Sequence, residues 1–194
     1  LSDAQQIALN EINNTFEEKS VVLFQGVTGS GKTEVYIELI AQAITKGKQV
    51  LYLLPEISLT PQMVQRLQAR FGSEVTVYHS KFSVHERTEV WNNILENNPN
   101  AKIIVGTRSA LFLPFHQLGL VIVDEEHELS YKQFDPSPRY HARDSAVVLA
   151  GMYQAKAILG SATPALESSF NRLSGKYGWV QLGERYGKVA LPEI

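Results

Sequence analysis

Cysteine is absent from the 194-residue sequence, and long hydrophobic runs are absent as well. Without thiols the chain forms neither a disulfide framework nor a thiolate metal site. No apolar run approaches the ~18 residues that a membrane-spanning helix needs, and residues 1–20 are polar, without the apolar core of a secretory leader. We therefore expect no membrane association and a cytoplasmic location.

A strong excess of charge of either sign is also missing. The net charge is −2, with 44% hydrophobic and 20% charged residues, as in an ordinary globular domain. Such a balance predicts no bulk attraction to nucleic acid, so any polyanion site must be a local patch. The chain begins at Leu1 rather than at methionine and runs to Ile194 without a clear stop, and we expect a fragment of a longer protein.

Apolar runs alternate with segments of helical periodicity along the chain. Several runs are continuous in Val, Ile and Leu, which is typical of parallel strands buried on both faces. The alternation predicts an α/β fold of three layers with a mainly parallel sheet. The expected strands are Val21–Gln25, Gln49–Leu54, Glu74–His79, Lys102–Gly106, Gly119–Asp124 and Lys156–Gly160.

Helices are expected between these strands, over Thr33–Lys46, Pro61–Phe71 and Val84–Glu96, with a further one starting at Thr163. Thr60 precedes the second as an N-cap, and Ser83 with Glu86 forms a capping box for the third. Residues 175–194 are predicted to be an irregular tail that contains a short strand at Trp179–Leu182.

The glycine-rich segment GVTGSGKT at residues 26–33 fits the pattern G-x-x-x-x-G-K-[ST]. Glycines let successive backbone N–H groups turn inward around phosphate oxygens, and the following helix adds its positive N-terminal end. Lys32 would reach the β and γ phosphates and the Thr33 hydroxyl would bind Mg²⁺. The candidate nucleotide-binding residues here are Gly26, Thr28, Gly29, Ser30, Gly31, Lys32 and Thr33.

An acidic segment, DEEH, follows the buried run Leu120–Val123. A carboxylate at the carboxyl end of a hydrophobic strand is where a P-loop protein holds Mg²⁺, so we expect Asp124 to bind the metal through water. Glu125 is then placed to act as general base on the attacking water. With Lys32, these two carboxylates are the candidate catalytic residues. His127 is expected to link this site to neighbouring segments.

The combination of GKT and DEEH resembles the DExH signature of superfamily 2 helicases. Six segments in order are similar to those of the primosomal replication-restart DNA helicases of that superfamily: GVTGSGKTEVY, LLPEISLTPQM, GTRSALFLPF, VDEEHELSYKQ, RYHARD and LGSATPALES. The segment Leu1–Gln5 resembles the glutamine motif of these enzymes, which implies that Gln5 reads the adenine edge.

The resemblance implies a role for the whole chain. Residues 1–194 would be a single RecA-like lobe, the first of two, with residues 175–194 leading toward the second. The full-length protein would be a 3′→5′ helicase that uses ATP and Mg²⁺ to unwind stalled replication forks, with zinc bound outside this chain. Its implied partners are forked and single-stranded DNA, other primosome proteins and single-stranded DNA-binding protein, and we expect a monomer.

The segment SYKQFDPSPRYHARD, residues 130–144, mixes aromatic, basic and proline residues soon after the acidic segment. The resemblance implies an aromatic-rich loop that couples DNA contact to ATP hydrolysis. Bases would stack on its rings and phosphates would meet its cations. Packing of the rings on the domain, with the cations paired to nearby carboxylates, is the alternative. The candidate DNA contacts are Tyr131, Lys132, Arg139, Tyr140 and Arg143.

Further candidate DNA contacts come from the motifs that resemble those of the helicases. Thr60, Thr107 and Arg108 lie where backbone N–H groups or a cation could receive a phosphate, although plain helix capping explains them equally well. Ser161 and Thr163 follow an expected strand, and we interpret them as relays between the nucleotide and DNA sites.

Three other functions remain open at this point. Another DExH nucleic-acid translocase would share every motif. A P-loop enzyme that does not act on DNA, such as a small-molecule kinase, would need an acceptor pocket and leaves DEEH with GSATP unexplained. A transporter-type ATPase would need an LSGGQ-like signature. The isolated lobe is expected to be nearly inactive, because the second lobe of such helicases supplies an arginine that stabilises the transition state.

Overall fold

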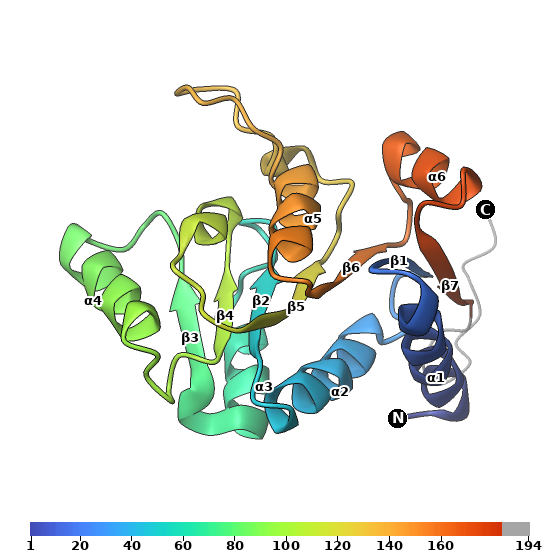
Figure 1. Ribbon diagram of the computed structural model, residues 1–194, viewed down its shortest axis with the longest axis horizontal. Helices are drawn as coiled ribbons and strands as arrows, with labels where there is room; N and C mark the ends of the chain where they lie inside the picture. The colour runs from blue at the N-terminus through green and yellow to red at the C-terminus, as the bar shows by residue number, and fades with distance from the viewer. Residues whose placement is uncertain (184–194) are drawn as a thin grey trace.

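A parallel sheet forms the centre of the computed structural model, which describes residues 1–183 (Figure 1). The seven strands lie in the order β3-β4-β2-β5-β6-β1-β7, and every pairing between them is parallel. This confirms the expected α/β class. The strands are β1 (Val21–Gly26), β2 (Gln49–Leu53), β3 (Val75–Tyr78), β4 (Ile103–Gly106), β5 (Leu118–Val123), β6 (Lys156–Ser161) and β7 (Gly178–Leu182).

Helices cover both faces of the sheet and complete the three layers. The apolar sides of α1, α2 and α3 pack on one face, and α4 and α5 pack with residues of the other. The helices are α1 (Asp3–Glu18), α2 (Lys32–Thr45), α3 (Pro61–Phe71), α4 (Val84–Leu95), α5 (Ala142–Met152) and α6 (Leu166–Leu173), with short 3₁₀ turns η1 (Gly72–Glu74), η2 (Arg108–Phe112) and η3 (Leu129–Tyr131).

The strand sequences explain why this sheet is buried on both faces. All residues of β2 and β4 are buried, and their alternate side chains contribute to two separate apolar clusters, one on each side. Continuous Val, Ile and Leu runs are required for this, because each side chain meets a helix layer whichever way it points.

Two helices were not expected from the sequence. Helix α1 spans residues that we interpreted only as a motif, although Ser2 and Gln5 form a capping box at its start. Helix α5 begins at Ala142, inside the segment expected to be a loop. A third helix, α6, begins at Leu166 rather than at Thr163. Before it, the Thr163 N–H bonds to the Ser161 hydroxyl and the Ala165 N–H bonds to the Glu126 carboxylate.

The predicted irregular tail is also corrected in part. The short strand expected at its centre is present as β7 and pairs with β1 along the edge of the sheet. Residues 178–182 are therefore part of the domain, while residues 184–194 of the predicted tail lie outside the described residues.

The carboxyl ends of β1, β6 and β5 lie next to one another at one edge of the sheet. The glycine-rich segment follows β1, the acidic segment follows β5 and Ser161 closes β6. Parallel strands bring such segments to a common edge, where α/β proteins bind ligands. In the described residues, no helix is both long and apolar enough to cross a membrane.

Candidate functional site

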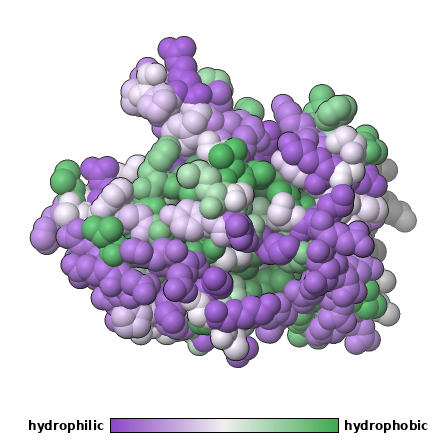
Figure 2. All heavy atoms as spheres, viewed as in Figure 1, coloured by the Kyte–Doolittle hydropathy of each residue, from purple (hydrophilic) through white to green (hydrophobic). Residues whose placement is uncertain are grey.

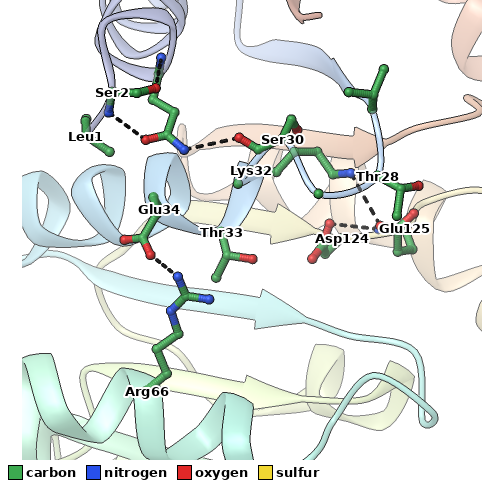
Figure 3. Close-up of a pocket in the computed structure, with 14 residues that line it drawn as sticks. Leu1, Ser2, Thr28, Ser30, Lys32, Thr33, Glu34, Arg66, Asp124 and Glu125 are labelled. Atoms are coloured by element: carbon green, nitrogen blue, oxygen red, sulfur yellow. Dashed lines mark hydrogen bonds and ion pairs between the residues drawn. The ribbon is translucent and has the colours of Figure 1, made fainter. Parts of the chain in front are cut away.

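The glycine-rich loop borders a cavity of about 760 Å³ (Figure 3). Gly29 and Gly31 have φ angles of 79° and 83°, in the left-handed region that glycine adopts without strain. The loop then runs directly into α2, whose N-terminus faces the cavity. Its lining residues are Leu1, Ser2, Gln5, Val27, Thr28, Gly29, Ser30, Gly31, Lys32, Thr33, Glu34, Arg66, Asp124 and Glu125.

Two glycines of the loop are required by close contacts. A Cβ on Gly31 would lie 2.3 Å from the Gln5 side-chain nitrogen, and one on Gly26 would lie 2.7 Å from the Lys32 Cγ. The buried Gln5 accepts a hydrogen bond from the Ser2 backbone N–H (2.8 Å) and donates one to the Ser30 carbonyl (3.1 Å). The amide therefore ties the start of α1 to the loop, whatever it contributes to adenine recognition.

Lys32 joins the loop to the acidic segment. Its buried ammonium donates to the Gly26 carbonyl at 3.0 Å and lies 3.5 Å from the Glu125 Oε1. The structure thus brings together the three residues expected to be catalytic. Thr33 lies on the cavity wall one residue further along α2.

Asp124 is buried and held by two tyrosine hydroxyls that the sequence did not single out. Tyr36 donates to its Oδ1 at 3.1 Å and Tyr52 donates to its Oδ2 at 3.2 Å. Burial, and then the neighbouring Glu125 carboxylate, raise the pKa of Asp124 from 3.8 to about 6, while Lys32 opposes the rise. A nearby cation is therefore needed to hold this carboxylate fully charged.

Glu125 has a φ of 46°, which is uncommon for a residue other than glycine. Strained backbone of this kind persists when surrounding contacts over-determine it. Two backbone hydrogen bonds provide these contacts. The Glu125 N–H bonds to the Asp124 Oδ1 at 3.1 Å, and the Glu126 N–H bonds to the Gly160 carbonyl at 2.9 Å. The conformation directs the Glu125 carboxylate toward Lys32 and the cavity (Figure 3).

His127 contacts β6, as its expected linking role requires. Its Nδ1 lies 2.7 Å from the Ser161 Oγ, and the same hydroxyl accepts the Thr163 backbone N–H at 2.9 Å. The ring nitrogen also lies 3.8 Å from the Glu125 Oε2. Ser161 is buried and Thr163 is exposed, so the two expected relays occupy different environments.

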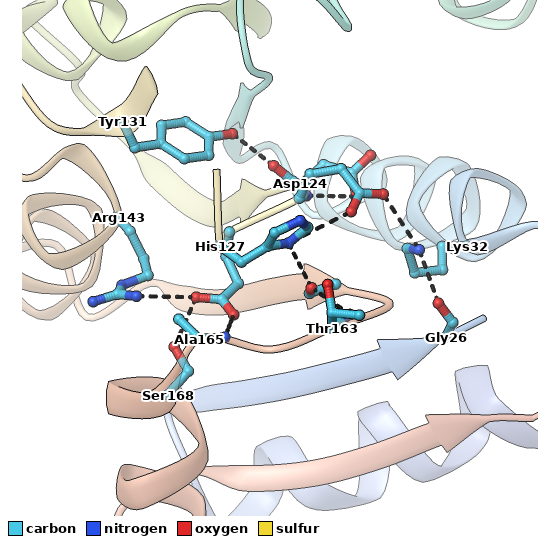
Figure 4. A network of polar contacts seen from close by, with 12 residues as sticks. Gly26, Lys32, Asp124, His127, Tyr131, Arg143, Thr163, Ala165 and Ser168 are labelled. Carbon is cyan, nitrogen blue, oxygen red and sulfur yellow. Dashed lines mark hydrogen bonds and ion pairs between the residues drawn. The ribbon is translucent and has the colours of Figure 1, made fainter. Parts of the chain in front are cut away.

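Glu126 is fully buried and connects three elements. Figure 4 shows its three partners, Arg143, Ala165 and Ser168. Its Oε1 accepts the Ala165 backbone N–H at 2.7 Å, and its Oε2 accepts the Ser168 hydroxyl at 2.8 Å and the Arg143 guanidinium at 3.3 Å. The carboxylate therefore fastens the start of α6 and the start of α5 to the end of β5. Apart from the acidic motif itself, no sequence pattern predicted this role.

Two of the DNA contacts expected in residues 130–144 are buried. Tyr131 is 1% exposed, and its hydroxyl donates to the carbonyls of Asp124 (2.7 Å) and Leu53 (3.1 Å). Arg143 is 4% exposed, and besides Glu126 it binds Asp144 at 2.8 Å. In this arrangement neither side chain can meet a base or a phosphate. For these two residues the packing alternative describes the structure.

The rest of the segment projects from the domain beside α5 (Figures 1 and 2). A backbone bridge between Lys132 and His141 closes its base. Arg139 is exposed, whereas Tyr140 is half-buried and its ring packs edge-on against Phe112 at 5.1 Å. Phe134, which was not among the expected contacts, is 66% exposed. It is therefore the most accessible of the loop's aromatic rings.

The remaining expected DNA contacts have local partners. Thr60 caps α3, since its hydroxyl accepts the Met63 N–H at 3.3 Å. Thr107 is buried, and its hydroxyl has no hydrogen-bond partner in the part of the chain that the structure describes. Arg108 donates to the carbonyls of Ser130 (3.1 Å) and Lys132 (3.3 Å). This last contact supports the base of the projecting loop.

The cavity has the donors that a magnesium–nucleotide complex needs. Carboxylate and hydroxyl oxygens suit Mg²⁺, and Asp124 and Thr33 both line the cavity. Among residues 1–183, the buried Ser30 hydroxyl has no hydrogen-bond partner. The glycine loop leaves room that Cβ atoms would fill. These observations fit phosphate at the loop and a divalent cation between the loop and β5.

Comparisons with known proteins agree with this geometry. A family model described as DEAD/DEAH box helicase matches residues 2–170. The chain is 45% identical over its whole length to the replication restart protein PriA of Bacillus subtilis, and 51% identical over 87% of its length to that of Haemophilus influenzae. It spans about a quarter of these relatives, 24% and 23% of their lengths.

Solved structures share the fold. RecG bound to a three-way DNA junction superposes with a TM-score of 0.67 at 23% identity, over 99% of this chain and 24% of that one. The Hef helicase domain of Pyrococcus furiosus gives 0.64 at 19% identity, over 95% of this chain and 38% of that one. These likenesses identify the three-layer domain as RecA-like.

Proposed function

The chain belongs to the DEAD/DEAH box helicase family, and on that premise we propose that it is the ATP-binding lobe of a replication-restart DNA helicase. The contact between Lys32 and Glu125, 3.5 Å apart across the cavity mouth, carries the proposal. It joins the phosphate loop to the acidic segment, so one bound nucleotide would meet both. The relatives named as replication restart proteins support the DNA substrate.

Each residue of the cavity has a distinct part in ATP hydrolysis. The backbone N–H groups of residues 29–33 and the start of α2 bind the phosphates, and Lys32 neutralises their charge. Thr33 and Asp124 would hold Mg²⁺, which supplies further charge neutralisation when bound. Glu125 orients the attacking water and accepts its proton. Gln5 orders the loop from the adenine side.

The projecting loop is anchored on both sides of Glu125, which gives a route for coupling. Tyr131 holds the Asp124 carbonyl and Arg143 holds the Glu126 carboxylate. These are the residues immediately before and after the general base. A displacement of the loop by DNA would therefore act on the backbone that sets the orientation of Glu125.

DNA binding by the loop is tested by fluorescence anisotropy of a labelled fork at two salt concentrations. Phe134 and Arg139 replace the buried residues as the accessible contacts, so the variant is Phe134→Ala with Arg139→Ala. We expect about ten-fold weaker binding, because one base stack contributes ~1–3 kcal/mol. Wild-type binding should also weaken with salt as phosphate contacts require.

The matched control is Phe170→Ala with Arg70→Ala. Phe170 is 67% exposed on α6 and Arg70 is exposed on α3, so the control removes the same side chains from elsewhere on the surface. Equal affinity of the loop variant and the control would remove the loop from the DNA-binding surface.

The isolated chain is expected to hydrolyse ATP at a rate near background. Arg66 is the one arginine among the cavity-lining residues of the described chain, and it is paired with Glu34. A transition-state arginine contributes 10³–10⁵ in rate in related NTPases, and the second lobe would supply it. Steady-state phosphate release measured with and without single-stranded DNA checks this, and helicase-like turnover by the chain alone would contradict it.

The properties of the full-length protein extend the proposal beyond this lobe. They comprise 3′→5′ unwinding at stalled forks, zinc bound in another region, a monomeric state in the cytoplasm, and contacts with primosome proteins and single-stranded DNA-binding protein. Another DExH translocase and a P-loop NTPase without a DNA substrate remain the competing functions. The fork-binding experiment separates the second of these from the proposal.

A further inference from the structure

Two buried tyrosines donate hydrogen bonds to the two carboxylate oxygens of Asp124. Tyr36 comes from α2 and Tyr52 from β2, and both are 0% exposed. Each hydroxyl donates to a different carboxylate oxygen, at 3.1 Å and 3.2 Å. A buried hydroxyl needs a partner, but a backbone carbonyl would serve equally well. Packing alone therefore does not explain why both hydroxyls donate to the same carboxylate in the candidate site.

The rings are held firmly in this arrangement. Phe24, Tyr36 and Tyr52 form a series of edge-to-face contacts with centroid separations of 5.9 and 5.7 Å. Strand β6 makes room for the first hydroxyl, since a Cβ on Gly160 would lie 1.7 Å from the Tyr36 Oη. The side chains are thus fixed before any ligand arrives.

The hydroxyls also limit what the carboxylate can bind. Burial raises the pKa of both tyrosines well above 10, so they keep their protons and remain donors. Oδ1 accepts both Tyr36 and the Glu125 N–H, and Oδ2 accepts Tyr52. A carboxylate has about four lone-pair sites. The free site lies on the oxygen that carries a single donor, so bidentate chelation of a metal is excluded.

We propose that Tyr36 and Tyr52 are positioning residues that fix the Asp124 carboxylate in one orientation, presenting a single lone pair to the Mg²⁺ that accompanies the nucleotide. The inference rests on the proposed ATP site. It adds residues from α2 and β2 to the metal-binding arrangement.

The test is equilibrium binding of a fluorescent, non-hydrolysable ATP analogue, titrated with Mg²⁺ from an EDTA-containing start. The variants are Tyr36→Phe and Tyr52→Phe, each of which removes one hydroxyl and keeps the ring. Tyr153→Phe is the control, because its hydroxyl also donates to a protein acceptor, the Phe115 carbonyl at 2.7 Å, outside the cavity. Thermal unfolding of all four proteins is measured in parallel.

We expect the two variants to bind the analogue in EDTA as the wild type does, but to need on the order of ten-fold more Mg²⁺ for half-maximal enhancement, as loss of one hydrogen bond to a charged group predicts. A purely structural role would lower the unfolding temperature and leave the Mg²⁺ midpoint unchanged. An unchanged Mg²⁺ midpoint in Tyr36→Phe and Tyr52→Phe, or an equal shift in the Tyr153→Phe control, overturns this inference but leaves the proposed ATP site standing. Absence of Mg²⁺-dependent binding in the wild type overturns the proposed ATP site and this inference with it.

Discussion

Asp124 is a buried carboxylate, which folding favours in its neutral form, whereas the proposed Mg²⁺ role needs its charged form. Its carboxylate is buried beside Glu125, and its pKa is raised to about 6 mainly by burial. An ionised group in such surroundings destabilises the fold unless a cation compensates. The site is therefore built to receive a positive charge, which agrees with the proposed Mg²⁺ role.

The variant Asp124→Asn tests this directly through stability. Between pH 3.8 and about 6 the folded wild type keeps a proton that the unfolded chain has released, so its free energy of unfolding falls as pH rises through that window. The asparagine variant has no carboxyl group at this position, so its free energy of unfolding does not fall for this reason. Its stability relative to wild type should rise across the window by up to about 3 kcal/mol and stay level above it.

Chemical denaturation at a series of pH values in EDTA measures the difference, and added Mg²⁺ with nucleotide should reverse its sign at neutral pH. A difference that does not vary with pH would show that Asp124 keeps its ordinary pKa in the folded protein.

At the same scale, the sequence pointed to the phosphate loop and the acidic pair, because their chemistry depends on residue type at fixed spacing. It did not point to Tyr36 and Tyr52. Their part depends on which side chains from α2 and β2 converge on one carboxylate, and that is set by the tertiary packing. The burial of Tyr131 and Arg143 was open for the same reason.

At the scale of elements, Glu126 unites β5, α5 and α6. It lies within a motif whose neighbours face the cavity, yet its own side chain points into the protein and holds the starts of two helices. This arrangement makes the projecting loop, which runs directly into α5, part of the same rigid unit as the acidic segment.

The variant Glu126→Gln should lower the free energy of unfolding by about 3 kcal/mol, because it leaves the buried Arg143 without its buried carboxylate partner; Asp144 and Glu167, which also pair with it, are exposed. The variant Arg143→Met removes the guanidinium instead. If the two side chains act as a pair, the free energy of unfolding should fall clearly less in the double variant than the sum of its decreases in the two single variants. Urea denaturation of the four proteins gives the coupling, and additive losses would contradict the proposed connection.

Sequence patterns predicted the central elements well and the peripheral ones less well. Strands β2, β4 and β5 were predictable because they are continuous apolar runs. Helix α1 was missed although Ser2 and Gln5 mark its start, because these residues were interpreted only as a nucleotide-binding motif. Helix α5 was missed because the prolines just before it drew attention to a loop, while the repeating Ala142, Ala146 and Ala150 that pack it give only a weak apolar signal.

At the scale of the whole molecule, the domain is a sheet whose carboxyl edge carries every candidate catalytic residue. Strands β1, β6 and β5 lie side by side there, so phosphate loop, relay and acidic segment meet without any long connection. The projecting loop rises from the same region, so the proposed DNA contact and the proposed ATP chemistry lie within a few residues of each other. The order of the strands was not predictable from the alternation of elements alone.

The central claim is that the phosphate loop and the acidic segment form one magnesium–nucleotide site. The most direct measurement is binding of a fluorescent ATP analogue in the presence of Mg²⁺ to wild type, Lys32→Ala and Glu125→Gln. The account predicts binding by wild type and by Glu125→Gln, whose oriented water is needed only for hydrolysis, and loss of at least about ten-fold in affinity in Lys32→Ala. Equal affinity in Lys32→Ala, or no binding by the wild type, would contradict it.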